Sequence, residues 1–229
     1  MQNGIAMVTG ANRGIGKAIV SGLVKKGFHV ILAVRRESEG KETSLEIDPS
    51  NSEVIRLDVT DAKCIKEAAA MVGQKHARLD VLINNAGIIG EEKSTMDEGN
   101  IEEIRTIMEV NYFGPMQVNA AFLPLLKKSQ DPRIINMSSG MGALDSLTGD
   151  YAGYRLSKAG LNAQTIMLAN SLKGEVKVFS MCPGWVKTDM GGSNAPRTPE
   201  LGADTAIWLA EDEAAESGKF YRDRKVIDW

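Results

Sequence analysis

Short apolar runs alternate with longer segments of helical spacing along most of the chain. The runs that predict strands fall at 5–8, 28–34, 54–57, 79–83, 133–137 and 176–181, with a weaker one at 219–221. Most of them are continuously apolar, which is typical of parallel strands that helices cover on both faces. The pattern therefore predicts one α/β domain over 1–229: a doubly wound Rossmann domain with a mostly parallel seven-stranded sheet and helices on both faces.

Helical spacing predicts the segments between these strands. A first helix is expected from Ile15 to Lys26, and Gly27 would end it. Segment 35–51 is charged and is interpreted as a partial helix followed by a loop. A helix is predicted at 61–76, with Thr60 or Asp61 as the N-cap, and a long one at about 101–126, with a bend at Pro115. A further helix holds Tyr154 and ends near Lys173, and the last one begins at Thr198.

Composition narrows the classes of function. A chain of 229 residues fits one domain, and 43% apolar with 25% charged residues is ordinary for a globular protein. The net charge of −3 gives no electrostatic reason to expect nucleic acid or an anionic membrane as a partner. No apolar run approaches the roughly 18 residues of a membrane span. Because the first strand begins close to Met1, no room is expected for a targeting segment, and a cytoplasmic protein is the simplest expectation.

The chain contains two cysteines and two histidines. Cys64 and Cys182 are far apart and are expected to be buried, reduced thiols. His29 and His76 are each predicted to stand alone beside the end of an element, as solvated or capping residues. No metal site is expected.

A glycine-rich turn follows the first apolar run. Gly10, Gly14 and Gly16 lie where a strand is predicted to pass into a helix, with Asn12, Arg13 and Ile15 between them. Glycines at such a turn permit a tight bend, a close approach of the backbone to phosphate groups and close packing of the helix. The turn therefore predicts a binding site for the pyrophosphate of a dinucleotide at the helix N-terminus.

Tyr154 and Lys158 are four residues apart in a predicted helix, so their side chains share one face. A phenol can give or take a proton, although a free tyrosine titrates only near pH ~10. The Lys158 ammonium and a positive nicotinamide are expected to bring the pKa of Tyr154 towards neutrality. Tyr151 is the nearby competitor, but Arg155 lies four residues beyond it in place of a lysine.

Two arginines indicate which dinucleotide binds. Enzymes that use NAD usually carry an acidic residue at the end of the second strand, where this chain has Arg35. A guanidinium there, together with Arg13, can hold the 2′-phosphate of NADP(H). The alternative is that both arginines are simply solvated. NADP(H) is predicted in preference to NAD(H).

With these residues placed, the chain closely resembles the compact subgroup of the short-chain dehydrogenase/reductase family. The motifs that carry the resemblance are the glycine turn from Thr9 to Gly16, the segment 84–87, Asn111, Ser139, Tyr154 with Lys158, and Pro183 with Gly184, in the family's order and at its spacing. Segment 182–190 is similar to the carbonyl reductases of the family. Many monomeric carbonyl reductases carry a long insertion between the serine and the tyrosine, whereas 14 residues separate Ser139 from Tyr154 here.

The resemblance implies a role for each matching residue. Ser139 would hydrogen-bond the substrate oxygen, with Ser138 as the alternative that instead braces the strand end. Asn111 would hold a water that feeds protons towards Lys158, in a locally distorted helix, although a satisfied buried asparagine is the other interpretation. Asp58 would contact the adenine, or else act only as a turn residue. The remaining residues implied to line the cofactor site are Val59, Asn85, Ala86, Gly87, Pro183, Gly184, Val186 and Thr188.

The polar, glycine-rich segment 184–200 is predicted to be a flexible flap over the substrate. Within it, Met190 and Trp185 are expected in the substrate wall, with core packing as the equal alternative for Trp185. Small residues on the predicted Tyr154 helix, such as Gly153 and Gly160, would permit close approach of a second helix, so a homodimer or homotetramer is expected.

The function expected from these features is NADPH-dependent reduction of a ketone, aldehyde or quinone, with Tyr154 as general acid. A small-molecule carbonyl or alcohol is thus the predicted partner, and no nucleic acid or membrane. One alternative is an NAD(P)-dependent alcohol dehydrogenase that works in the oxidative direction. A second is a non-catalytic nucleotide-binding sensor on the same fold.

Overall fold

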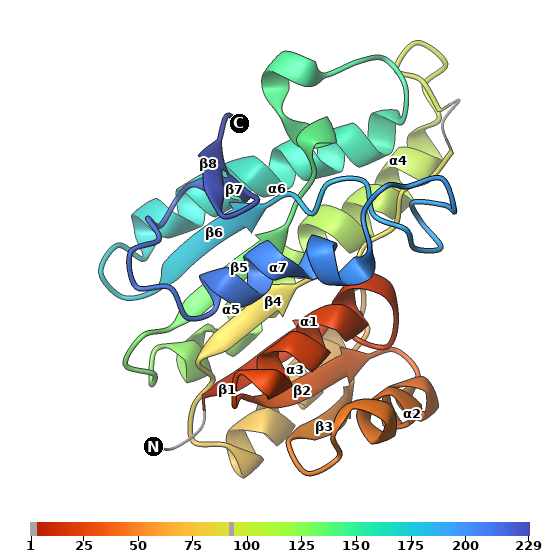
Figure 1. Cartoon of the computed structure of the whole chain (residues 1–229). Helices are drawn as coiled ribbons and strands as arrows, with labels where there is room; N and C mark the ends of the chain where they lie inside the picture. Colours follow the sequence, from red (N-terminus) through yellow and green to blue (C-terminus); the bar gives the residue numbers. More distant parts are fainter. Residues whose placement is uncertain (1–3, 92–93) are drawn as a thin grey trace.

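The computed structural model describes residues 4–91 and 94–229, and a twisted sheet forms their centre (Figure 1). The described strands lie in the order β3-β2-β1-β4-β5-β6-β7-β8. Every neighbouring pair is parallel except β7 and β8. The strands are β1 (Ile5–Thr9), β2 (His29–Val34), β3 (Ser52–Arg56), β4 (Val81–Asn84), β5 (Arg133–Met137), β6 (Lys177–Met181), β7 (Phe220–Arg222) and β8 (Lys225–Ile227). The predicted doubly wound α/β fold is confirmed.

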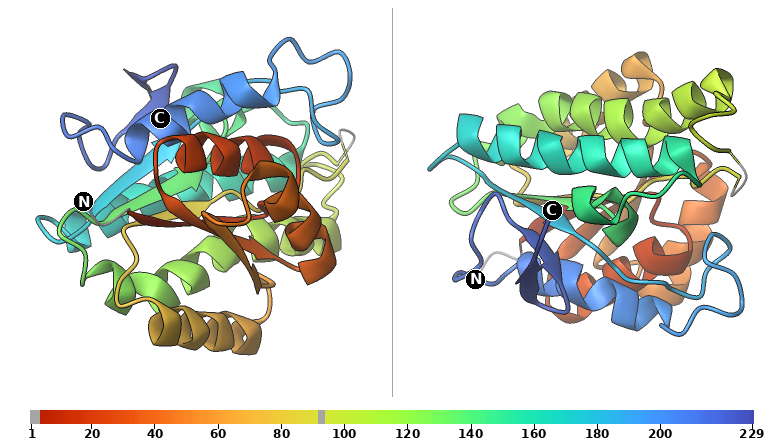
Figure 2. Two further views of the ribbon diagram at one scale, coloured as in Figure 1. Left: turned by 60° about the horizontal axis from the view of Figure 1, so that its bottom comes forward. Right: turned by 90° about the horizontal axis from the view of Figure 1, so that it is seen from above.

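Helices cover both faces of the sheet (Figure 2). Helices α1 and α7 pack on one face, and α3, α5 and α6 pack on the other. The helices are α1 (Gly14–Lys25), α2 (Glu37–Ile47), α3 (Ala62–Lys75), α4 (Ile101–Met108), α5 (Gly114–Leu126), α6 (Ala152–Ser171) and α7 (Pro199–Leu209), with a π-helical segment at Glu109–Phe113 and 3₁₀ turns at Gly140–Gly142 and Leu144–Ser146. Alternate residues of β1 enter different cores, Ala6 on one side and Met7 on the other. This two-sided burial is why the strands are continuously apolar.

The number of strands differs from the expectation. The described sheet has eight strands instead of seven, because β7 and β8 form a hairpin through Asp223 and Arg224. Both turn residues have positive φ, 51° and 59°. Such a turn usually contains Gly or Asn, so this sequence carries no signal for it. Segment 35–51 contains α2 (Glu37–Ile47) followed by a loop, as predicted.

The long helix predicted at 101–126 is interrupted before Pro115. A π-helical segment, Glu109–Phe113, separates α4 from α5, and Pro115 lies in the first turn of α5. The distortion expected at Asn111 is therefore confirmed. Asp61 caps α3 through hydrogen bonds from the N–H groups of Lys63 and Cys64, as predicted.

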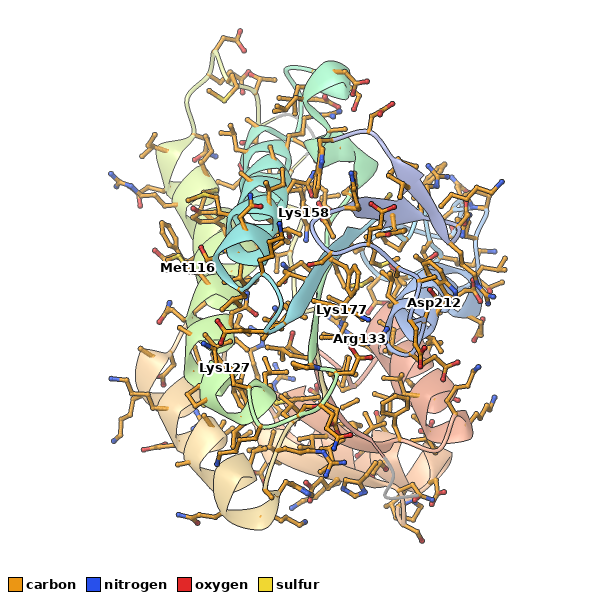
Figure 3. The ribbon with its side chains drawn as sticks, turned by 90° about the vertical axis from the view of Figure 1, so that its left-hand side faces the viewer. Met116, Lys127, Arg133, Lys158, Lys177 and Asp212 are labelled. Carbon is orange, nitrogen blue, oxygen red and sulfur yellow. The ribbon has the colours of Figure 1, made fainter. Side chains whose placement is uncertain are left out.

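Buried polar side chains tie the layers together. Asn84, at the end of β4, donates to Asn119 (2.7 Å) and Asn136 (2.8 Å), so it braces β4 against α5 and β5. Arg133 of β5 is 1% exposed and donates to the carbonyls of Leu209 and Asp212, which fixes the end of α7 (Figure 3). These hydrogen bonds hold the ends of β4 and α7 in place.

Two predictions about small or isolated residues are corrected by the packing. Gly153 and Gly160 of α6 face their own chain: an added Cβ would lie 2.8 Å from Ile107 and 2.9 Å from Tyr112. These glycines thus serve packing inside the chain, not the approach of a second subunit. His29 and His76 do not stand alone either, since Glu53 lies between them.

Cys64 and Cys182 are free and buried, as expected. Among the described residues, no helix is both long and apolar enough to cross a bilayer.

Candidate active site

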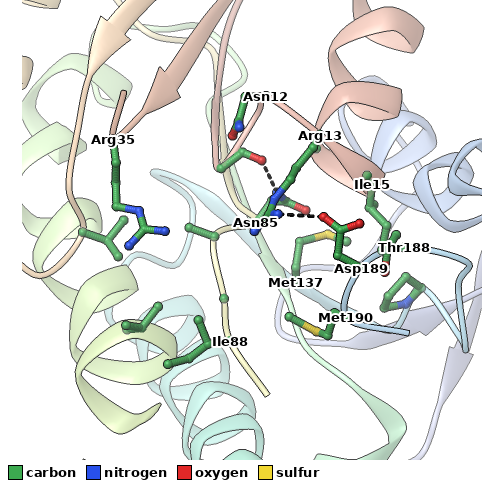
Figure 4. Close-up of a pocket in the computed structure, with 18 of the residues that line it drawn as sticks. Asn12, Arg13, Ile15, Arg35, Asn85, Ile88, Met137, Thr188, Asp189 and Met190 are labelled. Carbon is green, nitrogen blue, oxygen red and sulfur yellow. Dashed lines mark hydrogen bonds and ion pairs between the residues drawn. The ribbon is translucent and has the colours of Figure 1, made fainter. Parts of the chain in front are cut away.

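A cavity of about 900 Å³ opens at the carboxyl ends of the parallel strands (Figure 4). This is where ligands bind in doubly wound sheets. Its lining contains most of the residues predicted for the site: Gly10, Asn12, Arg13, Gly14, Ile15, Gly16, Arg35, Asp58, Val59, Asn85, Ala86, Gly87, Tyr154, Lys158, Pro183 and Thr188. The sequence motifs are therefore brought together at one place.

The glycine turn has the geometry that its sequence predicts. Gly10 and Gly14 have φ of +64° and +53°, a region that side chains with a Cβ rarely adopt. Gly16 lies in the first turn of α1, where an added Cβ would be 2.3 Å from the Gly10 carbonyl oxygen and 2.6 Å from Nδ2 of Asn85. The helix can therefore pack this closely on the turn only with glycine at this position.

Thr9 and Asn85 fix the turn to the end of β4. The Thr9 hydroxyl accepts from the N–H groups of Asn85 and Ala86, both at 3.0 Å. The Asn85 amide donates to the carbonyls of Thr9 (2.9 Å) and Gly10 (3.1 Å). These bonds place Ala86 and Gly87 beside the glycine turn, along the same cavity.

Arg35 enters the cavity from the end of β2 (Figure 4). Its neighbour Arg36 is paired with Glu39 (2.6 Å), which also accepts from Nδ2 of Asn12 (2.8 Å). Within the described chain, Arg35 has no ion pair of its own, so its guanidinium can receive an anionic ligand. Glu39, an acid that the sequence did not place here, is held by Arg36 and Asn12.

Asp58 is both a turn residue and part of the cavity wall. Its carboxylate accepts from the N–H (3.0 Å) and the hydroxyl (2.8 Å) of Thr60. Burial raises the pKa of Asp58, but the bonds from Thr60 and the charges of Arg35 and Arg56 outweigh it and lower the pKa. Asp58 is thus an ionised carboxylate that faces the cavity, which agrees with both interpretations of its role.

Arg13 connects the glycine turn to the segment after β6. Its guanidinium lies 2.6 Å from the Asp189 carboxylate, and both side chains are largely exposed (Figure 4). Arg13 and Arg35 line one cavity as predicted, but Arg13 already has a partner. To bind a phosphate with this guanidinium, the chain would have to share or give up the pair with Asp189.

Tyr154 and Lys158 lie on the first two turns of α6 and are 8% and 5% exposed. The Lys158 ammonium is 5.6 Å from the centre of the Tyr154 ring and donates to the Met137 carbonyl at 2.7 Å. Tyr151 precedes α6, and Arg155 is paired with Asp150 instead (2.8 Å). Of the two tyrosines, Tyr154 lines the cavity.

The pKa of Tyr154 differs from the expectation. Burial raises it to about 12, a hydrogen bond with Ser139 lowers it, and the charge of Cys182 raises it. Burial lowers the pKa of Lys158 to about 8, and Cys182 opposes that change. The prediction of a near-neutral pKa for Tyr154 took account of nearby positive charge but not of the loss of hydration on burial. In this chain by itself, the loss of hydration has the larger effect on the pKa.

The two serines after β5 have different environments. Ser139 hydrogen-bonds Tyr154 and also accepts from the Met141 N–H at 3.1 Å. Ser138 is 2% exposed, lines the cavity and donates to the Lys158 carbonyl at 3.4 Å, so it braces α6 against the strand end. Ser139 thus hydrogen-bonds the phenol but lies outside the cavity lining, and its bond to a substrate oxygen stays a prediction.

Asn111 is fully buried in the π-helical segment. Its oxygen accepts from the Ile88 N–H (2.9 Å), and its Nδ2 donates to the Ile88 carbonyl (2.8 Å) and to Ser157 (3.0 Å). The side chain therefore holds the segment after β4 in place, and Asn111 itself is outside the cavity lining. This is the satisfied buried asparagine of the second interpretation.

Segment 184–200 begins outside the cavity and then enters it. Gly184 and Val186 do not line the cavity; Val186 is 4% exposed and pairs with Arg197 in a short bridge. Met190 lines the cavity, whereas Trp185 is 57% exposed and donates to the Gly191 carbonyl at 2.7 Å. Core packing of Trp185, one of its two interpretations, is thus wrong.

Comparison with known proteins agrees with this geometry. The family described as short chain dehydrogenase matches residues 4–198. The chain belongs to the short-chain dehydrogenase family. This membership makes it an oxidoreductase that depends on a nicotinamide dinucleotide, and it confirms the resemblance read from the motifs.

Three similar proteins illustrate the range of this family. (+)-Neomenthol dehydrogenase of Arabidopsis thaliana is 32% identical, over 98% of this chain and 97% of that protein. Carbonyl reductase [NADPH] 1 of Sus scrofa is 28% identical, over 98% of this chain and 94% of that protein. The NADPH-bound carbonyl reductase from chicken fatty liver has a TM-score of 0.90 and 31% identity, and all of both chains is covered. The alignment with the Arabidopsis protein spans 289 positions, so that dehydrogenase contains segments that this 229-residue chain lacks.

Several residues of this dehydrogenase's cavity were not predicted. They include Arg36, Glu39, Ile88, Met137, Lys187 and Asp189. Asp189 directly follows the predicted Thr188, and Arg36 directly follows Arg35. Adjacency to a predicted site residue was the only feature of the sequence that could have placed these two in the cavity. Glu39 gave none, because its approach to Asn12 depends on how α2 packs.

Proposed function

We propose that the chain reduces a carbonyl compound to an alcohol with NADPH, and that Tyr154 is the general acid. The phenol gives its proton to the carbonyl oxygen as negative charge develops there. Ser139 donates a hydrogen bond to the same oxygen and orients the phenol. A positioned acid of this kind accelerates a reaction by about 10²- to 10⁴-fold.

One observation carries this proposal: the phenol of Tyr154 lies in the wall of the cavity that the glycine turn and Arg35 also line. Its pKa of about 12, raised by burial, keeps it protonated at neutral pH. Reduction needs a protonated acid at this position, whereas oxidation of an alcohol needs a base. The phenol is therefore in the protonated state that reduction requires, while the net direction depends on the ratio of NADPH to NADP⁺.

The cofactor is NADP(H), and it supplies the hydride when bound. Arg35 would hold the 2′-phosphate, since its guanidinium faces the cavity and forms no ion pair among the described residues. The names of the pig and chicken relatives both include NADPH. The N-terminus of α1, which begins at Gly14 in the cavity wall, would receive the pyrophosphate.

Lys158 would bind the ribose hydroxyls next to the nicotinamide through its ammonium. That group now donates to the Met137 carbonyl, and a Cβ on Gly87 would lie 3.7 Å from it. The absence of that Cβ leaves room beside the ammonium. The π-helical segment at Asn111 is the proposed place for a water that returns protons towards Lys158 and Tyr154.

Three further expectations stay predictions: the closing of segment 184–200 over substrate, the cytoplasmic location and the homo-oligomer. For the last, α6 leaves Leu156 and Met167 exposed, 40% and 69%. A second chain would bury these apolar side chains in an interface.

The test is NADPH consumption with a panel of ketones, aldehydes and quinones at pH 7, beside NADP⁺ reduction with the matching alcohols. We expect turnover with at least one carbonyl class, and a slower oxidation that speeds up in alkali. Binding of NADPH with no turnover on any carbonyl would favour the non-catalytic sensor. Carbonyl reduction at an unchanged rate by Tyr154→Phe would contradict the role of Tyr154 as the acid.

A further inference from the structure

Three side chains with metal-binding atoms meet at the end of the sheet opposite the cavity. His29 is the first residue of β2, Glu53 lies in β3, and His76 follows the last turn of α3. Arg35, by contrast, follows the far end of β2 and faces the cofactor cavity. The group is therefore separate from the residues proposed for catalysis.

The register of the strands explains why these side chains converge. Glu53 pairs with Ile31, and His29 lies two residues before Ile31, so both point to the face that holds Ile31. Helix α3 covers that face and brings His76 to its edge, one turn after the buried Val72. Three elements that are distant in sequence thus supply one side chain each.

The ligand atoms are near the spacing of a metal site. Nε2 of His76 is 2.5 Å and Nε2 of His29 is 3.7 Å from Oε1 of Glu53. One ligand atom from each residue lies within 4.8 Å of the others. A tetrahedral zinc ion with bonds of about 2.0–2.1 Å places its ligands roughly 3.3 Å apart. Shifts of about an ångström in these side chains would therefore suffice.

One atom of the group has no partner among residues 4–91 and 94–229. Nε2 of His29 is buried and makes no hydrogen bond within that part of the chain, and its 3.7 Å separation from the Glu53 carboxylate is too long for one. A buried polar atom without a partner is unfavourable. A metal ion between the two imidazoles and the carboxylate would satisfy it. The three side chains are 27%, 18% and 14% exposed, in chain order, so an ion can reach them from solvent.

Lys75 is the charged neighbour that opposes a cation here. Its ammonium pairs with the other carboxylate oxygen, Oε2 of Glu53, and its side chain is 65% exposed. Oε1 thus remains available to the histidines and to a metal. Because Lys75 is largely in solvent, it can move away when a cation binds, but its charge lowers the affinity.

We propose that His29, Glu53 and His76 bind Zn²⁺, with water as the fourth ligand. Two imidazole nitrogens and one carboxylate oxygen are a ligand set that zinc uses in proteins. The ion would join β2, β3 and α3 at the amino end of the sheet. Its effect would be on the stability of the fold, not on the chemistry in the cavity.

The test is zinc binding by calorimetry to the chain without a histidine tag. His29 and His76 are the two histidines of the whole sequence, so no other imidazole can compete. We expect one ion per chain and a higher midpoint of thermal unfolding with zinc. His29→Gln and His76→Gln should each weaken binding by about 100-fold or more, since losing even an outer-shell partner costs about 10- to 100-fold.

A matched pair of lysine variants tests the geometry further. Lys75→Gln removes the cation beside Glu53 and should tighten zinc binding. Lys63→Gln removes the same charge from α3, but Lys63 pairs with the exposed Glu67, so it should leave zinc affinity unchanged. Equal effects of the two variants would mean that zinc does not bind at Glu53.

Cobalt substitution separates this site from the thiols Cys64 and Cys182. Histidine and carboxylate ligands give cobalt d–d absorption without thiolate-to-metal charge transfer. Absence of zinc binding by the wild-type chain at millimolar zinc, binding that survives the double variant His29→Gln with His76→Gln, or a thiolate band would each overturn the proposal. NADPH turnover is expected to persist in all four single variants.

Discussion

The charged form of Lys158 is predicted to lower the free energy of unfolding. Lys158 is 5% exposed, and burial lowers its pKa from 10.5 to about 8. At about 1.36 kcal/mol per pKa unit, this shift of about 2.5 units corresponds to roughly 3 kcal/mol of instability while the lysine is charged. Lys158→Met removes the charge and keeps a chain of similar length, so no large cavity forms.

The gain from Lys158→Met is partly offset by a lost hydrogen bond. The charged Lys158 donates to the Met137 carbonyl at 2.7 Å, and a hydrogen bond from a charged group contributes about 1.5–3 kcal/mol. The variant should therefore be more stable than the wild type by about 1 kcal/mol at pH 7. For a chain of this size that is a rise of about 2–4 °C in melting temperature.

The difference should depend on pH with a definite sign. Between pH 8 and 10.5 the unfolded wild type binds more protons than the folded chain, because its Lys158 is still charged. Wild-type stability at this residue therefore rises with pH over that window. By pH 9.5 the remaining penalty is only about 1 kcal/mol, so the advantage of the variant should nearly vanish.

The assay is urea unfolding of both proteins, without cofactor, at pH 7 and pH 9.5. Both proteins share every other titrating group, so the difference between them isolates Lys158. A variant that is less stable than the wild type at pH 7, or an advantage that is equal at both pH values, would refute this reasoning. Turnover should be lost in either case, since the ammonium is proposed to hold the cofactor.

Two further substitutions test the cofactor site. Arg35→Asp should lower the preference for NADPH over NADH by roughly 10- to 100-fold, because hydrogen bonds to charged groups contribute about 1.5–3 kcal/mol; an unchanged preference would rule out this arginine as the phosphate ligand. Gly16→Ala should destabilise the chain by about 2 kcal/mol in urea unfolding and weaken NADPH binding, since its Cβ would lie 2.3 Å from the Gly10 carbonyl oxygen. The control Gly149→Ala, whose Cβ would meet nothing within 4 Å, should change stability by less than about 1 kcal/mol.

The site residues that could be predicted are those whose positions are set by local backbone geometry or by the helical period. Gly10, Gly14 and Gly16 are required by backbone geometry, which a spacing of glycines reveals. Tyr154 and Lys158 share a helix face because of the helical period alone. Continuous apolar runs predicted a parallel sheet, and the order of the chain then brought the strand ends together.

The parts that were missed depend on packing between distant segments. The pKa of Tyr154 follows from how completely α6 is buried, which the sequence of one helix does not contain. His29, Glu53 and His76 meet only through the register of β2 with β3 and the length of α3. The turn of the β7–β8 hairpin holds Asp223 and Arg224 at positive φ without glycine. None of these has a local signal.

The most direct measurement is the single-turnover rate of NADPH oxidation by Tyr154→Phe, with Tyr151→Phe as the matched control three residues away. Tyr154→Phe should slow the reduction of a carbonyl by about 10²- to 10⁴-fold, because only the proton donor is removed. Its affinity for NADPH should stay within a few fold, and Tyr151→Phe should react at the wild-type rate. A Tyr154→Phe protein that oxidises bound NADPH as fast as the wild type would contradict the proposed chemistry.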